Sequence, residues 1–155
     1  MLLNELLRPE LIKLGLEAQN KEEAISELVD LLVQEHEVAM KHRQSVLEAV
    51  LAQEDSLGSG MEEGIAIPHA TTDHTDDILC AIGTAPNGIS FASLDGEPTK
   101  LVVLVLGPKR NFAGEIRTLM GVQNLLANES LKQQIIDATD AQALYEVLIA
   151  EEPEI

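Results

Sequence analysis

The most informative stretch for the fold is Leu101-Val102-Val103-Leu104-Val105-Leu106, in which all six consecutive residues are apolar. A strand with one solvent-exposed face alternates apolar and polar residues, whereas a strand covered on both faces does not. The run therefore predicts a strand in the centre of a sheet. Residues 78–85 predict a second buried strand, and the turn-rich stretch 86–98 separates the two, with a short strand possible from Ile89 to Phe91.

Amphipathic helices lie on either side of these strands in the sequence. Five segments have apolar residues at helical spacing: 21–35, 41–54, 114–127, 129–138 and 140–150. The first is the best defined, because Asn20 is a good N-cap and Glu23 follows three residues later. In the third segment, 114–127, the apolar residues at helical spacing are Ile116, Leu119, Met120, Leu125 and Leu126.

The order of these elements predicts an α/β fold. Residues 11–18 alternate well enough for an edge strand, and helices precede and follow the central strands. We expect a single-domain sandwich over 1–155, with a mixed central sheet of about five strands flanked by helices on both faces. A chain of 155 residues suits one domain of this kind.

Composition narrows the function classes. The chain has 10 Lys and Arg against 27 Asp and Glu, a net charge of −17, which argues against nucleic acid or an anionic membrane as a partner and favours a partner with a basic patch. No segment approaches the roughly 20 apolar residues that cross a bilayer, so we expect no membrane insertion and a cytoplasmic location. Cys80, the only cysteine, lies in an apolar run and is expected to be buried and inert, and we expect no cofactor and no metal.

The segment Gly64-Ile65-Ala66-Ile67-Pro68-His69-Ala70 is the most informative for function. Its Gly/Ile/Ala/Ile pattern is typical of a strand, and Pro68 cannot donate to a sheet ladder, so we expect the strand to end there and His69 to lie on a rim. An imidazole in that position can be a nucleophile, a proton shuttle or a metal ligand. A surface histidine in a turn fits the residues as well.

The same segment, preceded by two helices and a Gly/Ser-rich loop, resembles the active-site segment of enzyme IIA proteins of the bacterial phosphoenolpyruvate-dependent phosphotransferase system. The resemblance is to the fructose/mannitol/nitrogen-regulatory branch and covers essentially the whole chain. It also rests on Ile89-Ser90-Phe91 followed by Asp95-Gly96, on strand 101–106, and on the closing segment 144–148.

This resemblance implies that His69 accepts a phosphoryl group from the carrier HPr, or from its nitrogen-branch paralogue, and passes it to a IIB partner or serves as a regulatory mark. Neutral imidazole is a competent nucleophile toward phosphorus. The backbone amides of Gly58 and Gly60 and the hydroxyl of Ser59 are candidate donors to the phosphoryl oxygens. Ser59 is where the family usually has threonine, although an ordinary turn serine is an equal alternative.

The chain departs from the family at two positions. Members usually have an Arg-Glu pair at the end of the second helix, where this chain has Gln53-Glu54. Members also carry a second active-site histidine at the start of the helix after the central strand. Aligning Ile116, Leu119 and Val122 on the family pattern puts Glu115 in the place of that histidine.

Both departures lower the positive charge around a phosphate. Two unit charges ~4 Å apart interact by about 4 kcal/mol at an effective dielectric of ~20, so ionised Glu115 would oppose a phosphoryl dianion. Lys109 and Arg110 are candidate replacement cations. Alternatively, Glu115 accepts a hydrogen bond from the His69 ring and fixes its tautomer. A helix-terminal acid favoured by the helix dipole is the third interpretation of Glu115.

Three functions remain open from the sequence. The first is a phosphotransferase system component that carries a phosphoryl group on His69. The second is a nitrogen-regulatory-type paralogue that acts by binding another protein, with weak or no phosphotransfer. The third is a metal site on His69 and His74, whose spacing matches no standard ligand pattern. His42 is expected to be solvent-exposed.

Overall fold

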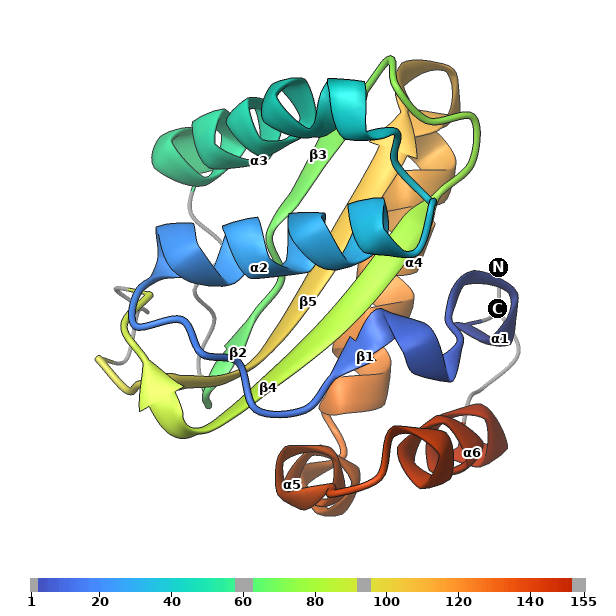
Figure 1. Cartoon of the computed structure of the whole chain (residues 1–155). Coiled ribbons are helices and arrows are strands. Elements are labelled where there is room, and N and C mark those ends of the chain that lie inside the picture. Colours follow the sequence, from blue (N-terminus) through green and yellow to red (C-terminus); the bar gives the residue numbers. More distant parts are fainter. Residues whose placement is uncertain (1–2, 58–62, 92–95, 152–155) are drawn as a thin grey trace.

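The computed structural model describes residues 3–57, 63–91 and 96–151 (Figure 1). Within these ranges one sheet contains five strands: β1 (Ile12–Lys13), β2 (Ile65–Ala66), β3 (His69–Thr72), β4 (Leu79–Ile89) and β5 (Thr99–Pro108). β1 is parallel to β4, and β4 is antiparallel to β5. β2 and β3 both run parallel to β5 along its other edge. The predicted mixed sheet of about five strands is confirmed.

Helices cover both faces of this sheet, as predicted. The described helices are α1 (Leu3–Leu6), α2 (Lys21–Gln34), α3 (Arg43–Leu57), α4 (Phe112–Leu126), α5 (Glu129–Asp137) and α6 (Ala141–Glu151), with short 3-10 helices η1 (Pro9–Leu11), η2 (Met40–His42) and η3 (Lys109–Asn111). Figure 1 shows α2 and α3 across one face, while α4 runs behind the sheet against β5. α5 packs against β4 and β5, and α6 packs against α1. None of the helices in the described ranges is both long and apolar enough to cross a bilayer.

The central strand is buried along its whole apolar run. All residues from Leu101 to Leu106 are buried, because β5 has a strand on each edge and helices on each face. The N-cap of α2 is also as predicted, since the Asn20 side chain accepts a hydrogen bond from the Glu23 N–H at 2.9 Å. Cys80 is buried on β4, and burial raises the pKa of its thiol to about 12, so the thiol is inert as expected.

Two strand boundaries differ from the prediction. β4 continues to Ile89 through a segment predicted as a turn, with a register shift between Thr84 and Ile89. Pro86 and Asn87 are exposed in this irregular stretch, which tolerates a residue without an N–H. On the opposite edge β1 contains only Ile12 and Lys13.

The short β1 has a local cause at Gly15. Gly15 has a φ of 78°, in the left-handed region that glycine adopts without strain, and this turns the chain out of the ladder. The Gly15 N–H then donates to the Thr84 hydroxyl at 2.9 Å, and the Leu16 N–H donates to the Thr84 carbonyl. The predicted edge strand over 11–18 is therefore reduced to two paired residues.

The burial of β5 makes a direct prediction about stability. Leu104 is fully buried, so Leu104→Ala removes apolar contacts and leaves a cavity, which should lower the free energy of unfolding by about 2–5 kcal/mol. Urea denaturation measures the loss. Met40→Ala is the control, because Met40 is 72% exposed and its truncation should change stability by no more than about 0.5 kcal/mol. Similar losses in the two variants would contradict this description of the core.

Candidate functional site

His69 lies where the strand beside β5 is interrupted and then resumes. β2 ends at Ala66, and β3 begins at His69, with Pro68 between them. Pro68 has no N–H, but its carbonyl accepts a hydrogen bond from the Val105 N–H at 3.0 Å, so pairing with β5 continues across the break. The strand before Pro68 ends as predicted, but pairing resumes at His69, so the prediction that His69 lies on a rim is wrong. His69 pairs with Val105, inside the length of β5.

The carbonyl of Ile67, which lies in this interruption, orients the His69 ring. Nδ1 of His69 is 2.9 Å from the carbonyl oxygen of Ile67. A carbonyl oxygen only accepts hydrogen bonds, so this contact requires the proton on Nδ1. In the neutral imidazole the lone pair then lies on Nε2. The half-buried ring therefore has one nitrogen anchored to the backbone and the other in the nucleophilic form.

The strand register places His69 on the same face of the sheet as α4. His69 pairs with Val105 and Thr71 pairs with Gly107, and paired residues of parallel strands point to the same face. A Cβ built on Gly107 would lie 2.8 Å from Oε1 of Glu115 and 3.2 Å from its Cβ. Gly107 therefore faces α4 at Glu115, and His69 shares that face. The absent side chain at Gly107 provides the space in which the carboxyl group lies.

Glu115 is buried at the start of α4 with an unsatisfied oxygen. The residue is 1% exposed, and its Oε1 has no hydrogen-bond partner among the described residues. Burial raises the pKa of the Glu115 carboxyl, and the nearby His69 opposes this rise to a smaller extent. This burial sets it apart from the exposed helix-terminal acids that only complement a helix dipole.

The sequence suggested two relations of Glu115 to His69: repulsion of a phosphoryl group on the histidine, and a hydrogen bond from its ring. The structure brings the two residues close enough for the charge of one to act on the other. The predicted hydrogen bond from the His69 ring to Glu115 is absent from the described contacts, because Nδ1 is bound to the Ile67 carbonyl. The tautomer is thus set by the backbone rather than by the carboxylate.

The two candidate cations are engaged elsewhere. Lys109 lies 3.3 Å from a carboxylate oxygen of Asp73, and Arg110 lies 3.6 Å from that of Asp76. Arg110 also donates to the Asp76 carbonyl at 2.7 Å. Both side chains are about two thirds exposed, and they join η3 to the loop after β3. For Arg110 to bind a phosphoryl group, it must first leave Asp76.

The structure describes only some of the other residues that the sequence analysis proposed for the site. Gln53 is half-buried on α3, which packs against β3, and its neighbour Glu54 is buried. Gly58, Ser59 and Gly60 lie outside the described residues, so their roles stay predictions.

The exposed face of α4 corrects the sequence-based apolar set. Ile116 and Met120 belong to that set but are 37% and 57% exposed, and Phe112, one turn earlier, is 56% exposed. The helix turns Glu115, Thr118 and other residues toward the sheet instead. We call Phe112, Ile116 and Met120 the α4 stripe. Their spacing of four residues is the signal that could have identified them as one face.

His42 has a contact that the sequence did not suggest. Its ring stacks on that of His74, with centroids 3.9 Å apart, and His42 is half-buried, whereas it was expected to be solvent-exposed. Desolvation, His74 and Lys41 lower the pKa of His42, in that order of size. No group of three His, Cys, Asp or Glu residues that could hold a metal ion occurs in the described part of the chain.

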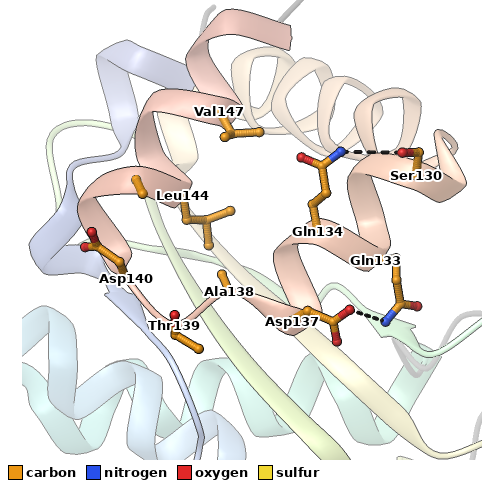
Figure 2. Close-up of a pocket in the computed structure, with 10 residues that line it drawn as sticks. Ser130, Gln133, Gln134, Asp137, Ala138, Thr139, Asp140, Leu144 and Val147 are labelled. Carbon is orange, nitrogen blue, oxygen red and sulfur yellow. Dashed lines mark hydrogen bonds between the residues drawn. The ribbon is translucent and has the colours of Figure 1, made fainter.

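A groove between α5 and α6 lies apart from these residues (Figure 2). Its volume is about 570 Å³, and Asp137, Leu144 and Val147 are among its lining residues. Figure 2 shows two hydrogen bonds within α5, from Gln134 to Ser130 and from Gln133 to Asp137. Neither His69 nor Glu115 lines this groove.

Comparison with known proteins identifies the class. The sequence profile of the family "Phosphoenolpyruvate-dependent sugar phosphotransferase system, EIIA 2" matches residues 5–151. The chain therefore belongs to this family, and the resemblance noted in the sequence is confirmed.

Individual relatives include fructose-specific, nitrogen-regulatory and mannitol-specific proteins. The chain is 32% identical over 148 residues to the PTS system fructose-specific EIIABC component of Bacillus subtilis, covering 96% of this chain but only 23% of that protein. It is 29% identical to the nitrogen regulatory protein of Bradyrhizobium diazoefficiens, covering 96% and 95% of the two chains. The mannitol enzyme IIA in a complex with phosphorylated enzyme IIB from Escherichia coli matches with a TM-score of 0.78 and 25% identity, covering 93% and 97% of the two chains.

Burial of Glu115 predicts how stability changes with pH. The pKa of Glu115 is raised in the folded chain, so protonation of its carboxyl stabilises the fold. This stabilisation is fully present below the ordinary pKa of 4.5 and is lost as pH rises through the folded-state pKa. Glu115→Gln removes this loss, so the stability of the variant relative to wild type should increase from pH 4 to pH 8. Urea denaturation at several pH values measures this difference. Glu22→Gln, at an exposed position on α2, should show no such trend, and a constant difference for Glu115→Gln would contradict the assignment.

Proposed function

We propose that this protein is a phosphoryl carrier of the phosphoenolpyruvate-dependent sugar phosphotransferase system. It accepts a phosphoryl group on His69 from HPr or its nitrogen-branch paralogue and passes it to a IIB partner. Residues 1–155 act as one EIIA type-2 domain in the cytoplasm. The observation that carries this proposal is the hydrogen bond from Nδ1 of His69 to the Ile67 carbonyl, which leaves Nε2 as the nucleophile.

In the transfer step the protein mainly has to position Nε2 of His69 in line with the phosphorus of the donor. Nε2 attacks the phosphorus of the phosphohistidine on the donor, the P–N bond of the donor breaks, and its electron pair returns to the donor imidazole. A P–N bond to Nε2 forms, and the His69 proton stays on Nδ1, held by Ile67. Phosphoryl transfer of this kind depends mainly on in-line placement and on donors for the phosphoryl oxygens.

Several residues are proposed to hold the phosphoryl oxygens. The Gly58 and Gly60 amides and the Ser59 hydroxyl would contribute donors, and Gln53 would contribute its side-chain amide. Arg110 would act after release from Asp76, to which it is bound in this structure. All of these roles rest on the family resemblance.

A second role, as a nitrogen-regulatory-type protein that acts by binding a target, is the alternative. It is favoured by the Bradyrhizobium relative, which is matched over 95% of its length, whereas the fructose relative is matched over 23%. It is also favoured by Gln53 and Glu115, which replace residues that would bring positive charge to the phosphate.

Incubation with phosphoenolpyruvate, enzyme I and HPr separates the two roles. We expect a mass gain of one phosphoryl group that is acid-labile and stable to base, as phosphohistidine is, and none in His69→Ala. Folding of the variant is checked by thermal unfolding. Phosphate on a residue other than His69 would overturn the site assignment. If the wild type takes no phosphate from either HPr or its paralogue, the binding role becomes the better description.

The α4 stripe is proposed as part of the surface that meets the phosphoryl partners. It lies on the same helix as Glu115 and exposes three large apolar side chains, Phe112, Ile116 and Met120. Exposed apolar patches of this kind are typical of protein interfaces. The Escherichia coli mannitol relative is known in a complex with phosphorylated enzyme IIB, which supports a protein partner on this family's surface.

Replacing the stripe should weaken transfer without unfolding the chain. For Phe112→Ser with Met120→Ser, we expect the KM for phospho-HPr to rise roughly tenfold, since hot-spot truncations cost about 1–2 kcal/mol or more. Little loss of stability is expected, because both side chains are more than half exposed. Ile149→Ser, at a similarly apolar exposed position on α6, is the control and should leave the KM unchanged. Equal effects of the two changes would exclude the stripe from the docking surface.

A further inference from the structure

We propose that the carboxyl group of Glu115, in its protonated form, donates a hydrogen bond to the phosphoryl group on His69, so that phosphorylation of this chain takes up one proton. The inference rests on the proposed function, because it concerns the phosphorylated state of His69. In this role Glu115 is a neutral hydrogen-bond donor, unlike a cation or an ionised carboxylate.

The geometry that supports the inference is an unpartnered acid next to the reactive ring. Glu115 is 1% exposed, and its Oε1 has no hydrogen-bond partner among the described residues. A buried polar atom without a partner is costly, and a ligand atom that pairs with it recovers that cost. His69 shares the α4 face of the sheet, and a protonated His69 lowers the pKa of Glu115. A phosphoryl group on Nε2 would bring acceptor oxygens to this face.

The other charged groups around Glu115 do not neutralise it. From η3, Lys109 and Arg110 are bound to Asp73 and Asp76. From α5, the buried Lys132 is held by Glu129 at 3.1 Å and by the carbonyl of Glu63 at 3.0 Å.

The strands contribute no further charge to this environment. β5 presents Gly107 and apolar residues along Leu101–Leu106, and β3 presents His69 as its ionisable group. On α4, Arg117 is exposed. His69 is thus the group whose charge reaches the carboxyl in this part of the structure.

The charge balance follows from this environment. Burial already raises the pKa of Glu115 in the free chain, and a dianion on His69 would raise it further because it disfavours a second negative charge. The proton comes from solvent, and the acid then donates its O–H to a phosphoryl oxygen. The bonds that form and break at phosphorus are those of the proposed transfer step. Glu115 thus has a higher pKa in the phosphorylated chain than in the free chain. Phosphorylation is therefore favoured as pH falls through the range between these two pKa values, and it gains nothing from Glu115 protonation above that range.

A competition experiment isolates this effect from the pH dependence of the donor. Wild-type protein and ¹⁵N-labelled Glu115→Gln share one tube with phosphoenolpyruvate, enzyme I and HPr, and mass spectrometry reads the phosphorylated fraction of each from pH 5 to pH 9. The glutamine amide donates a hydrogen bond without taking up a proton. The ratio of wild-type to variant phosphorylation should fall by up to about tenfold per pH unit as pH rises through the titration range.

Two further measurements test the donor itself. Glu115→Leu keeps similar bulk but has no donor, so in the same competition it should hold roughly tenfold less phosphate than Glu115→Gln. In ¹³C-glutamate-labelled protein, the Glu115 carboxyl signal, assigned by its loss in Glu115→Gln, should titrate at higher pH in the phosphorylated form than in the free form. Thermal unfolding confirms that each variant is folded.

The outcomes separate this inference from the proposed function. If neither wild type nor variants take phosphate on His69, both the proposed function and the inference fail. If His69 is phosphorylated but the ratio does not change with pH, or the Glu115 titration does not move upward, the inference alone is overturned. Equal phosphorylation of the leucine and glutamine variants would also overturn it.

Discussion

Backbone hydrogen bonding along both edges of β5 sets the geometry of the other strands and of the site. A strand buried on both faces cannot leave N–H or carbonyl groups unpaired, because no water reaches them. β4 satisfies one edge along its length, and β2 and β3 share the other. The partner edge can be interrupted only where a residue still supplies its carbonyl, and Pro68 does this for Val105. His69 is the first residue after that interruption, and the Ile67 carbonyl within the interruption accepts the hydrogen bond from its ring.

This arrangement separates the two demands on His69 in its proposed role as acceptor of a phosphoryl group. Orientation and tautomer come from the backbone at Ile67, so no side chain is required for them. The group on the opposite side of the site is therefore free to change its chemistry. In this chain it is Glu115, whose Oε1 has no hydrogen-bond partner among the described residues and whose pKa a protonated His69 lowers. A carboxylic acid and an imidazole can both donate a hydrogen bond, but the acid does so only when protonated.

The sequence predicted the layers of the fold better than the details of the site. Strand 101–106 and the helices around it were predictable, because burial on two faces and helical periodicity are local properties of the sequence. The continuation of the strand at His69 was not, since it depends on a carbonyl contact with Val105 that lies far along the chain. The exposed side of α4 was also missed, because Ile116 and Met120 are apolar and only the packing of Glu115 against Gly107 shows which way the helix is turned. The proximity of Glu115 to His69 came from the family resemblance and not from any local pattern.

The contact between Gly107 and Glu115 constrains which residues can occupy positions 107 and 115 during evolution. The carboxyl group of Glu115 occupies space that a side chain at residue 107 would need, with an Oε1 only 2.8 Å from where a Cβ would lie. A methyl group there would displace the acid from its place, whatever its charge. Substitutions at the two positions are therefore epistatic: glycine at 107 must be present before, or arise together with, a glutamate at 115. Sequences with glutamate at 115 should therefore have glycine at 107, whereas glycine at 107 is compatible with other residues at 115.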